Sequence, residues 1–418
     1  MKILLQLFMI LVLLSSCNTP SKEQSNKIAK SELSKTSPEA TFSSSVISES
    51  ANLWWARTLA DVDGDGILDV VLHDNNGSGG WLGYLKGNKI GKPWEQIKIA
   101  EVSPNGQKFA AGDLTAGDID GDGDVDLIGV EHPGEWTNAD ADAHLFWYEQ
   151  NGTEWTPHKI GSIPSALKDI ELSDLNKDGK PEIITVTYNA ETLSVFGMSE
   201  GKNFEKLWDL KINNLHEGLG IGDLDGDGHV DIAANGYWLP NPGNLDQVWE
   251  LKTIDDLWFS QEEDHWSRNA TKVVCKDIDN DNMAEVFISH SEKSGYPIVK
   301  YDWDNGQWKK EILLKELPAA HSLQIADVNM DGTYEVLSGV NRSRAINITE
   351  ELKLEEKPTT FPVVILNYDG TKWDSTHINE DGVYNLLAGD LEGDGDIDLI
   401  RWTSHDKKDM WLMTNNLK

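Results

Sequence analysis

The 418-residue sequence contains only two cysteines, Cys17 and Cys275. This excludes the disulfide framework that holds many secreted domains together. The motifs of several enzyme classes are also missing: we find no G-x-S-x-G, no C-x-x-C, no H-E-x-x-H and no glycine loop that could cradle a phosphate. The fold must therefore be held by a large core or by bound ions, and Cys275 is expected to be buried and inert.

Positive charge is scarce. The chain has 36 Lys and Arg against 71 Asp and Glu, and its formal net charge is −35. This balance argues against a nucleic-acid partner, because phosphate binding requires a basic surface. Many of the acids fall in the repeated loops described below, so the acidity is expected to reflect metal binding.

Long hydrophobic runs are absent beyond the N-terminus. The run from Ile3 to Leu14 follows Lys2 and is too short to remain in a membrane as a helix. The residues Leu14-Ser15-Ser16-Cys17 resemble the lipobox of bacterial lipoproteins. This resemblance implies a signal peptide over residues 1–16 and a lipid on Cys17; a plain secretory signal that contains a cysteine is the alternative.

Residues 17–40 are then the lipidated cysteine and a tether rich in Ser, Thr, Lys and Glu, which is expected to be disordered. We expect an outer-membrane lipoprotein that faces the periplasm or the cell surface. Its membrane contact would be through the lipid alone.

One acidic motif occurs seven times. The clearest copy is Asp223-Leu-Asp225-Gly-Asp227-Gly-His-Val-Asp231, with acids at positions 1, 3, 5 and 9. The copies start between 49 and 63 residues apart, a period typical of propellers, solenoids or arrays. Position 6 is glycine in six copies and Asn282 in the fifth; asparagine tolerates the left-handed backbone best after glycine.

Carboxylates packed this closely repel one another unless a cation lies among them. A flexible loop with oxygen ligands suits Ca²⁺ better than Mg²⁺. An EF-hand places its last acid at position 12 and lies between helices, whereas here the last acid is at position 9 and short apolar runs flank the loop. We therefore predict up to seven structural calcium ions. The predicted ligands are Asp61, Asp63, Asp65, Asp69, Asp118, Asp120, Asp122, Asp126, Asp174, Asn176, Asp178, Glu182, Asp223, Asp225, Asp227, Asp231, Asp277, Asp279, Asp281, Glu285, Asp327, Asn329, Asp331, Glu335, Asp390, Glu392, Asp394 and Asp398.

Each repeat has room for four short strands, one before the loop and three after it. This pattern predicts an all-β, seven-bladed propeller over residues 41–418. The last repeat stops one strand short, and residues 41–48 form a strand with no blade of their own. We therefore predict that this N-terminal strand closes the last blade and removes the exposed edges. An open solenoid is the alternative.

The loops and their flanks resemble the FG-GAP and VCBS repeats known from the integrin α-subunit propeller and from bacterial surface proteins. The resemblance covers residues 41–418 and implies a calcium-binding propeller, but it implies no function. A narrower resemblance lies in His216-Glu-Gly-Leu-Gly-Ile-Gly-Asp223, Asn235-Gly-Tyr-Trp-Leu-Pro-Asn241-Pro242, His290-Ser-Glu and His321-Ser-Leu-Gln-Ile-Ala-Asp327. These stretches are similar to the propellers related to aldos-2-ulose dehydratase, and several polysaccharide lyases also use seven-bladed propellers.

Residues just before the first strand of a blade and just after its second strand share the face opposite the acidic loops. Histidines concentrate in these windows, and three long insertions begin there, at about 131–143, 235–247 and 341–360. We expect a funnel-shaped site on this face. The candidate catalytic residues are His73, His132, His216, His290, His321, Tyr237, Tyr384, Arg401 and Lys168. Candidates for stacking on a sugar ring are Trp54, Trp55, Trp238 and Trp402.

Two classes of function follow. The first is a carbohydrate-active lyase, either an oligosaccharide dehydratase or a polysaccharide lyase, that performs β-elimination on uronic-acid-type or related sugars. In it His216 or His321 would be the base, Arg401 or Lys168 would neutralise charge, and Tyr237 or Tyr384 would be the acid. Three or more of the histidines could instead hold a divalent metal such as Zn²⁺. The second class is a non-catalytic, calcium-dependent surface module that binds glycan or protein. In either case we expect a monomer with a carbohydrate partner.

Overall fold

The computed structural model describes residues 40–49, 57–73, 79–88, 93–132, 141–262, 265, 267–404 and 407–417. The predicted signal peptide, Cys17 and almost all of the tether lie outside these residues, as do Trp54 and Trp55. Residues 40–418 form one unit. No helix among the described residues is both long and apolar enough to cross a membrane.

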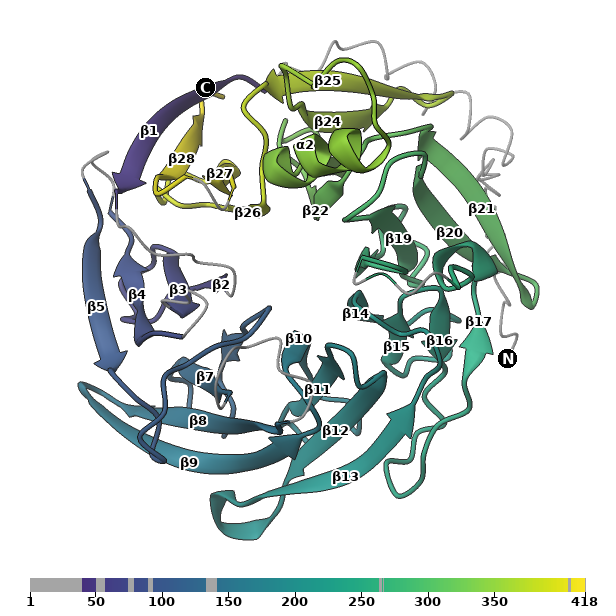
Figure 1. Cartoon of the computed structure of the whole chain (residues 1–418). Coiled ribbons are helices and arrows are strands. Elements are labelled where there is room, and N and C mark those ends of the chain that lie inside the picture. The colour runs from purple at the N-terminus through teal and green to yellow at the C-terminus, as the bar shows by residue number, and fades with distance from the viewer. Residues whose placement is uncertain are drawn as a thin grey trace, which may run out of the picture. The chain divides into compact units, whose positions relative to one another are not determined.

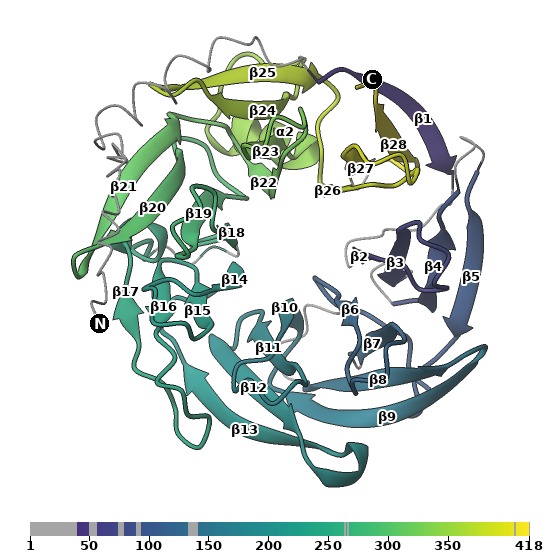
Figure 2. The ribbon, with the colours of Figure 1, turned by 180° about the vertical axis from the view of Figure 1, so that it is seen from behind.

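Seven four-stranded antiparallel sheets follow one another around a ring (Figure 1). The first strand of each blade is the innermost, and the later strands lie progressively farther out. Figure 2 shows the same order from behind. The prediction of an all-β, seven-bladed propeller is confirmed.

The blades have the following strands, from the centre outward. Blade 1 has β2 (Arg57–Ala60), β3 (Asp69–His73), β4 (Leu82–Lys86) and β5 (Glu95–Ala100). Blade 2 has β6 (Ala116–Gly117), β7 (Asp126–Glu131), β8 (Ala143–Asn151) and β9 (Glu154–Ile163). Blade 3 has β10 (Leu167–Ser173), β11 (Glu182–Thr187), β12 (Thr192–Met198) and β13 (Phe204–Lys211). Blade 4 has β14 (Leu219–Gly222), β15 (Asp231–Ala234), β16 (Tyr237–Leu239) and β17 (Lys252–Thr253). Blade 5 has β18 (Thr271–Lys276), β19 (Glu285–His290), β20 (Ile298–Asp304) and β21 (Gln307–Leu314). Blade 6 has β22 (Ala320–Ala326), β23 (Glu335–Val340), β24 (Val363–Tyr368) and β25 (Trp373–Asn379). Blade 7 has β26 (Asn385–Gly389), β27 (Asp398–Trp402), β28 (Met410–Asn415) and β1 (Phe42–Ser48).

The burial of the strands follows their place in the blade. The second strands, such as β11 and β23, are buried at every residue. The outer strands, such as β9 and β13, are mostly exposed or half-buried. The core therefore lies between neighbouring blades, where the faces of their inner strands meet.

The ring closes as predicted. β1 pairs with β28 in antiparallel register, from Phe42 opposite Asn415 to Ser48 opposite Met410. Ile47 is fully buried in a cluster with residues of blades 1 and 7. The Trp94 backbone N–H also donates to the Ile47 carbonyl at 2.8 Å, which ties the closing strand to blade 1.

The insertions differ from what the sequence indicates. Residues 341–360 carry a helix, α2 (Arg342–Glu351), whose N-cap Asn341 accepts a hydrogen bond from the Arg344 N–H. The stretch 235–247 begins on the predicted funnel face, but β16 then runs back across the blade. As a result the Asn241 N–H donates to Asp231, the last acid of the fourth loop, at 2.7 Å. Two short 3₁₀ helices span Glu200–Lys202 and Asp256–Trp258.

Candidate functional site

The seven acidic loops share one backbone geometry. Position 6 has a positive φ in every copy, including 70° at Asn282 and 85° at Gly228, which confirms the left-handed turn. The N–H of this residue donates to the first Asp of its loop at 2.8 to 3.0 Å. The N–H at position 2 donates to the acid at position 9 at 2.8 to 3.1 Å. Backbone hydrogen bonds thus gather the carboxylates at the turn.

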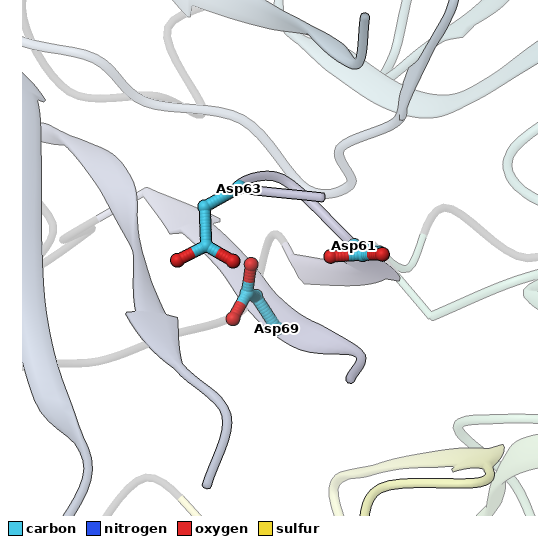
Figure 3. Close-up of side chains that lie close together, drawn as sticks. All are labelled: Asp61, Asp63 and Asp69. Atoms are coloured by element: carbon cyan, nitrogen blue, oxygen red, sulfur yellow. The ribbon is translucent and has the colours of Figure 1, made fainter. Parts of the chain in front are cut away.

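Four of the loops bring three carboxylates within 4.8 Å of one another, close enough to hold a metal ion. Figure 3 shows the first of these groups, Asp61, Asp63 and Asp69. The other groups are Asp118, Asp120 and Asp122; Asp223, Asp225 and Asp231; and Asp277, Asp279 and Asp281. In the first group the Lys86 ammonium contacts Asp63 and lies 3.1 Å from Asp65, so positive charge is attracted to this spot.

Burial disfavours the charged form of the acids at position 9 of the loops. Burial raises the pKa of Asp231 to about 7, and Asp225 and Asp227 raise it further against two backbone hydrogen bonds. The pKa of Glu285 is raised to about 7 for the same reasons. A cation among the carboxylates would reverse this penalty, so the donor set fits a hard divalent metal ion.

Loops 3 and 6 differ because asparagine stands at position 3. The Asn176 amide donates to Glu182 at 2.9 Å and lies 3.2 Å from Asp178. The Asn329 amide donates to Glu335 at 2.8 Å. In both loops the amide N–H groups partly offset the negative charge, although the amide oxygen remains available as a ligand.

At the opposite ends of the inner strands lies a cluster of charged side chains built around Glu217 and Glu292. The antiparallel pairing of β22 with β23 puts His321 near Val340, at the far end from the Asp327 loop. Glu217 is 1% exposed and lies 2.5 Å from Lys168 and 3.7 Å from Lys272. Burial would raise the pKa of Glu217, but the two lysines outweigh it and hold that pKa well below its ordinary value.

His216 is the histidine of this cluster that faces open space. Its side chain is 6% exposed and lines a cavity of about 240 Å³ with Tyr188, Glu191 and Arg268, here called the His216 cavity. Burial lowers the pKa of His216 to about 4, although Glu217 raises it. Among the residues that the structure describes, its ring nitrogens have no hydrogen-bond partner. A neutral, unpaired imidazole at a cavity wall can accept a proton from a bound ligand.

His290 is saturated. Its Nδ1 accepts from the Glu292 backbone N–H at 3.3 Å, so Nε2 of the neutral ring carries the hydrogen; the Gln261 side-chain amide lies 2.8 Å from Nε2 and can accept this hydrogen through its oxygen. The ring contacts that of Tyr296 at 4.3 Å. Burial lowers the pKa of His290 to about 4. Both nitrogens of this neutral ring are used within the protein, which leaves none for a ligand.

His321 is held from two sides. Its Nδ1 lies 2.8 Å from the Tyr384 carbonyl oxygen, and its Nε2 lies 3.1 Å from Glu292 Oε1. The rings of His321 and Tyr384 are 4.1 Å apart. On the far side of Glu292, Arg344 of α2 donates from Nε to the Glu292 carbonyl at 2.7 Å.

A second cavity of about 260 Å³, here called the axial cavity, lies where the first strands of the seven blades converge. Lys168, His321 and Tyr384 line it with Arg57 and Lys272, and opposite charge comes from Asp113, Asp169 and Glu171. Burial raises the pKa of Asp113 to about 7, with a further contribution from Asp169, and that of Glu171 to about 8. Lys168 also lies 5.8 Å from the Tyr188 ring, so it stands beside both cavities.

The other four candidate residues lie apart from this cluster. His73 is fully buried, its ring stacks on Phe109 at 5.7 Å, and burial lowers its pKa to about 3. His132 Nε2 bonds the Ala141 carbonyl at 3.1 Å. Tyr237 stacks on Phe259 at 3.9 Å and donates its hydroxyl to the Asn213 carbonyl. Arg401 is 2% exposed and donates to the Gly382 carbonyl at 2.9 Å.

The prediction that Trp238 and Trp402 stack on a sugar ring is wrong. Trp238 is 1% exposed and packs against Trp303 and Trp308 at 5.0 and 5.3 Å. Trp402 is fully buried beside Tyr384 and below Arg57. Both complete the core, so neither presents a face to a ligand.

The charged partners of the cluster are absent from the sequence-based candidates. Glu217 and Glu292 lie within the histidine motifs named above, yet only the fold reveals their ion pairs. Lys272 lies in β18, and Arg344 comes from the insertion after blade 6. The sequence signal that could have found Glu217 and Glu292 is an acidic residue within two positions of a funnel histidine, because a charge that becomes buried requires a partner.

A family model of FG-GAP-like repeats matches residues 61–129, 118–185 and 174–234, which contain the first four acidic loops. Residues 61–234 thus consist of FG-GAP-like repeats within a seven-bladed β-propeller. Loops five to seven continue the same backbone geometry beyond the matched residues, as the hydrogen bonds of Asn282, Gly332 and Gly395 show. No curated protein matches the sequence.

Solved structures share the architecture at low sequence identity. BBS1N, in a crystal structure of its complex with ARL6DN, is 11% identical, with a TM-score of 0.52, and the match covers 91% of this chain and 97% of that one. An Agrocybe aegerita lectin, described as recognising non-reducing terminal N-acetylglucosamine, is 17% identical, with a TM-score of 0.49 and coverage of 85% and 87%. At such identities the first likeness concerns the fold alone.

Proposed function

We propose that this FG-GAP-repeat propeller is a carbohydrate-active carbon–oxygen lyase that acts by β-elimination on uronic-acid-type or related sugars. The observation that carries the proposal is His216, a buried and neutral imidazole at the wall of a polar cavity, which has no hydrogen-bond partner among the described residues. A neutral imidazole at a cavity wall is available to a ligand, and a pKa perturbed at such a wall favours a functional role.

The neighbouring residues suit the remaining steps. His216 takes the proton α to the sugar carboxylate, and the C–H electron pair forms an enolate that Lys168 and Arg268 stabilise by their charge. The enolate then forms the C=C bond as the C–O bond breaks, and the departing oxygen keeps that electron pair. Burial raises the pKa of Tyr384, so its hydroxyl is protonated at neutral pH and can supply the proton that this oxygen takes.

The reaction as proposed requires a substrate that reaches both cavities. His216 and Arg268 line the His216 cavity, whereas Tyr384 lines the axial cavity, and Lys168 stands between them. The α carbon and the carbon that loses its oxygen are neighbours in one ring, so the reacting sugar must lie beside Lys168, where both His216 and Tyr384 must reach it, and the rest of a carbohydrate chain would extend into the two cavities. We therefore infer a carbohydrate chain as the substrate.

Calcium and a lipid anchor belong to the same proposal. We infer that the acidic loops bind Ca²⁺ with a structural role, since their oxygen-only donor sets fit that ion. The cluster of His216, His290 and His321 is not among the groups of described residues that could hold a metal, so we propose none there.

We also propose an outer-membrane lipoprotein anchored at Cys17; Cys17→Ser should then release the protein from membranes during fractionation.

The test is to incubate the calcium-loaded protein with a panel of uronic-acid polysaccharides and oligosaccharides and to follow unsaturated products near 235 nm. His216→Gln should lower turnover by about 10²–10⁴-fold without lowering the melting temperature. His377→Gln is the matched control, because His377 is exposed on an outer strand and its ring pairs with Glu380, away from both cavities as their lining shows. Full turnover in His216→Gln would refute the role of this base.

A non-catalytic surface module that binds glycan is the second candidate. The polar lining of the His216 cavity, with Asn189, Glu191, Asn214 and Arg268 beside Tyr188, also suits sugar hydroxyls. In that case no product would appear with any substrate. His216→Gln would then weaken glycan binding in calorimetry, whereas His377→Gln would bind as the wild type does.

A further inference from the structure

We propose that loops 3 and 6 are the low-affinity calcium sites of the propeller, because a side-chain amide inside each loop takes over part of the role of the cation. The inference rests on the calcium binding proposed above and is independent of lyase activity. It divides the seven acidic loops, which share one spacing of ligands, into two classes.

Loops 3 and 6 carry less negative charge than the other loops. Position 3 is Asn176 in loop 3 and Asn329 in loop 6, whereas it is Asp or Glu in every other copy. Positions 1, 3, 5 and 9 of these two loops therefore supply three carboxylates instead of four. The affinity of an oxygen-ligand site for Ca²⁺ depends on the number of charged ligands and on the rigidity of the site, so these loops should bind the ion more weakly.

In loop 3 a backbone hydrogen bond fixes which atom of the amide faces the other ligands. The Asn176 oxygen accepts from the Asp178 N–H at 2.8 Å, and the amide nitrogen donates to Glu182 at 2.9 Å. In loop 4 the Asp225 Oδ1 accepts from the Asp227 N–H at 3.3 Å, and its second oxygen remains as a ligand for a cation. The corresponding atom of Asn176 is a donor, which a cation repels. To present its oxygen there, the amide must turn and lose both hydrogen bonds.

Loop 6 has the same arrangement. The Asn329 oxygen accepts from the Asp331 N–H at 2.9 Å, and its nitrogen donates to Glu335 at 2.8 Å. The amide N–H carries partial positive charge, so it balances part of the charge of the position-9 acid in the absence of an ion. Two loops in different blades thus contain the same internal substitute for a cation.

A second asparagine supports each of these loops from the next blade. Asn241, after β16 of blade 4, donates its side-chain amide to the Leu175 carbonyl of loop 3 at 2.9 Å. Asn415, in β28 of blade 7, donates to the Val328 carbonyl of loop 6 at 2.8 Å. Both asparagines are more than nine-tenths buried. These bonds need no ion, so loops 3 and 6 should keep their shape when calcium leaves.

Loops 1 and 2 also contact a positive group, but one of a different kind. Lys86 contacts Asp63 in loop 1, and Lys202 contacts Asp120 in loop 2. The two lysine side chains are 35% and 41% exposed, so each ammonium can move into water and leave its carboxylates to a calcium ion. An amide that is itself a member of the ligand set cannot withdraw in this way. Loops 1 and 2 therefore belong to the tighter class, with loops 4, 5 and 7.

The two weak loops lie in blades that supply the axial cavity. Lys168 is in β10 of blade 3, His321 is in β22 of blade 6, and both line that cavity. A fall in calcium that empties only loops 3 and 6 should leave the cavity intact, because Asn241 and Asn415 still hold the loops.

The experiment is equilibrium dialysis of the full-length protein against stepped concentrations of free Ca²⁺, with elemental analysis of the bound calcium. The wild type should lose two ions per chain before the others. Asn176→Asp should transfer one of these ions to the tighter class, and Asn176→Asp with Asn329→Asp should transfer both. Each transferred ion should bind about tenfold more tightly or better, because the added carboxylate brings a full charge to it.

Asn379→Asp is the matched control. Asn379 also accepts from a backbone N–H, that of Asp381 at 2.7 Å, but it lies outside the acidic loops. This variant should keep two weakly bound ions.

Loss of all ions from the wild type in one step would overturn the proposal. Two weak ions in a folded Asn176→Asp variant would also overturn it, and if the double variant does not fold, the single variants decide. A wild type that never fills two of its loops, and gains one ion in Asn176→Asp, would support it. If the wild type binds no calcium at any concentration, the proposed calcium binding itself fails. Absence of lyase activity would change none of these outcomes.

Discussion

Ile47 offers the sharpest test of how the ring is closed. Its side chain is fully buried among residues of blade 1, such as Leu72, and of blade 7, such as Leu412. Truncation of a buried isoleucine to alanine costs about 2–5 kcal/mol through lost transfer energy and the cavity left behind. We expect Ile47→Ala to lie at the upper end of that range, because the cavity would open at the joint between two blades.

The assay is urea unfolding with Ca²⁺ present, followed by tryptophan fluorescence. Ser44→Ala is the matched control on the same strand, since Ser44 is exposed and should change stability by no more than about 0.5 kcal/mol. Ile47→Val should cost about 0.5–1.5 kcal/mol. If Ile47→Ala and Ser44→Ala unfold at the same urea concentration, β1 contributes little to closure and the reasoning is wrong.

Three further predictions concern ions and protons. Chelation of Ca²⁺ should lower the melting temperature by many degrees, because the buried position-9 acids lose their cation; a melt that ignores chelator would contradict the calcium prediction. The folded-state pKa of His73, about 3, lies below its unfolded value of about 6.5, so stability falls as the pH drops from 6.5 toward 3. His73 alone should cost the protein about 2 kcal/mol between pH 7 and pH 5, and His73→Phe should lose that part of the pH dependence in urea unfolding. Asn176→Asp should enlarge the melting-temperature difference with and without chelator, because it adds a carboxylate ligand and removes the amide that offsets charge; an unchanged difference would count against a metal ion in loop 3.

The sequence predicts the repeating parts of this molecule well. The blade count, the turn at position 6 and the closing strand each follow from spacing, because every repeat must bury the same face against its neighbours. Even the exception at Asn282 was predictable, since its conformation is imposed by the loop and not by the residue.

The site was harder to predict because a position along the repeat fixes the face of the disc but not the direction of a side chain. Successive residues of a strand point to opposite sides of the sheet. His73 and His132 follow their loops by an even number of residues and His290 by an odd number, so His290 points to the other side. His290 contributes to the cluster, whereas His73 packs on Phe109 in the core.

Helix α2 and the ion pairs could not be predicted from the repeat pattern. Residues 341–360 interrupt the repeat, and their helix supplies Arg344 to Glu292, which is 52 residues away in the sequence. Such contacts depend on how two blades pack, which no local pattern encodes.

The pairing of β1 with β28 also fixes when this protein can finish folding. Phe42 and Asn415 are partners, so one of the first strands to be synthesised waits for the last strand described here. Blades 1 to 6 are each continuous in the chain and can form as their residues emerge, whereas the seventh cannot. Closing so long a loop is slow, and until then β26–β28 present an open edge. We expect the last step of folding to be slow and sensitive to protein concentration, and a chain cut short before β28 to retain an unpaired strand that marks it for aggregation or degradation.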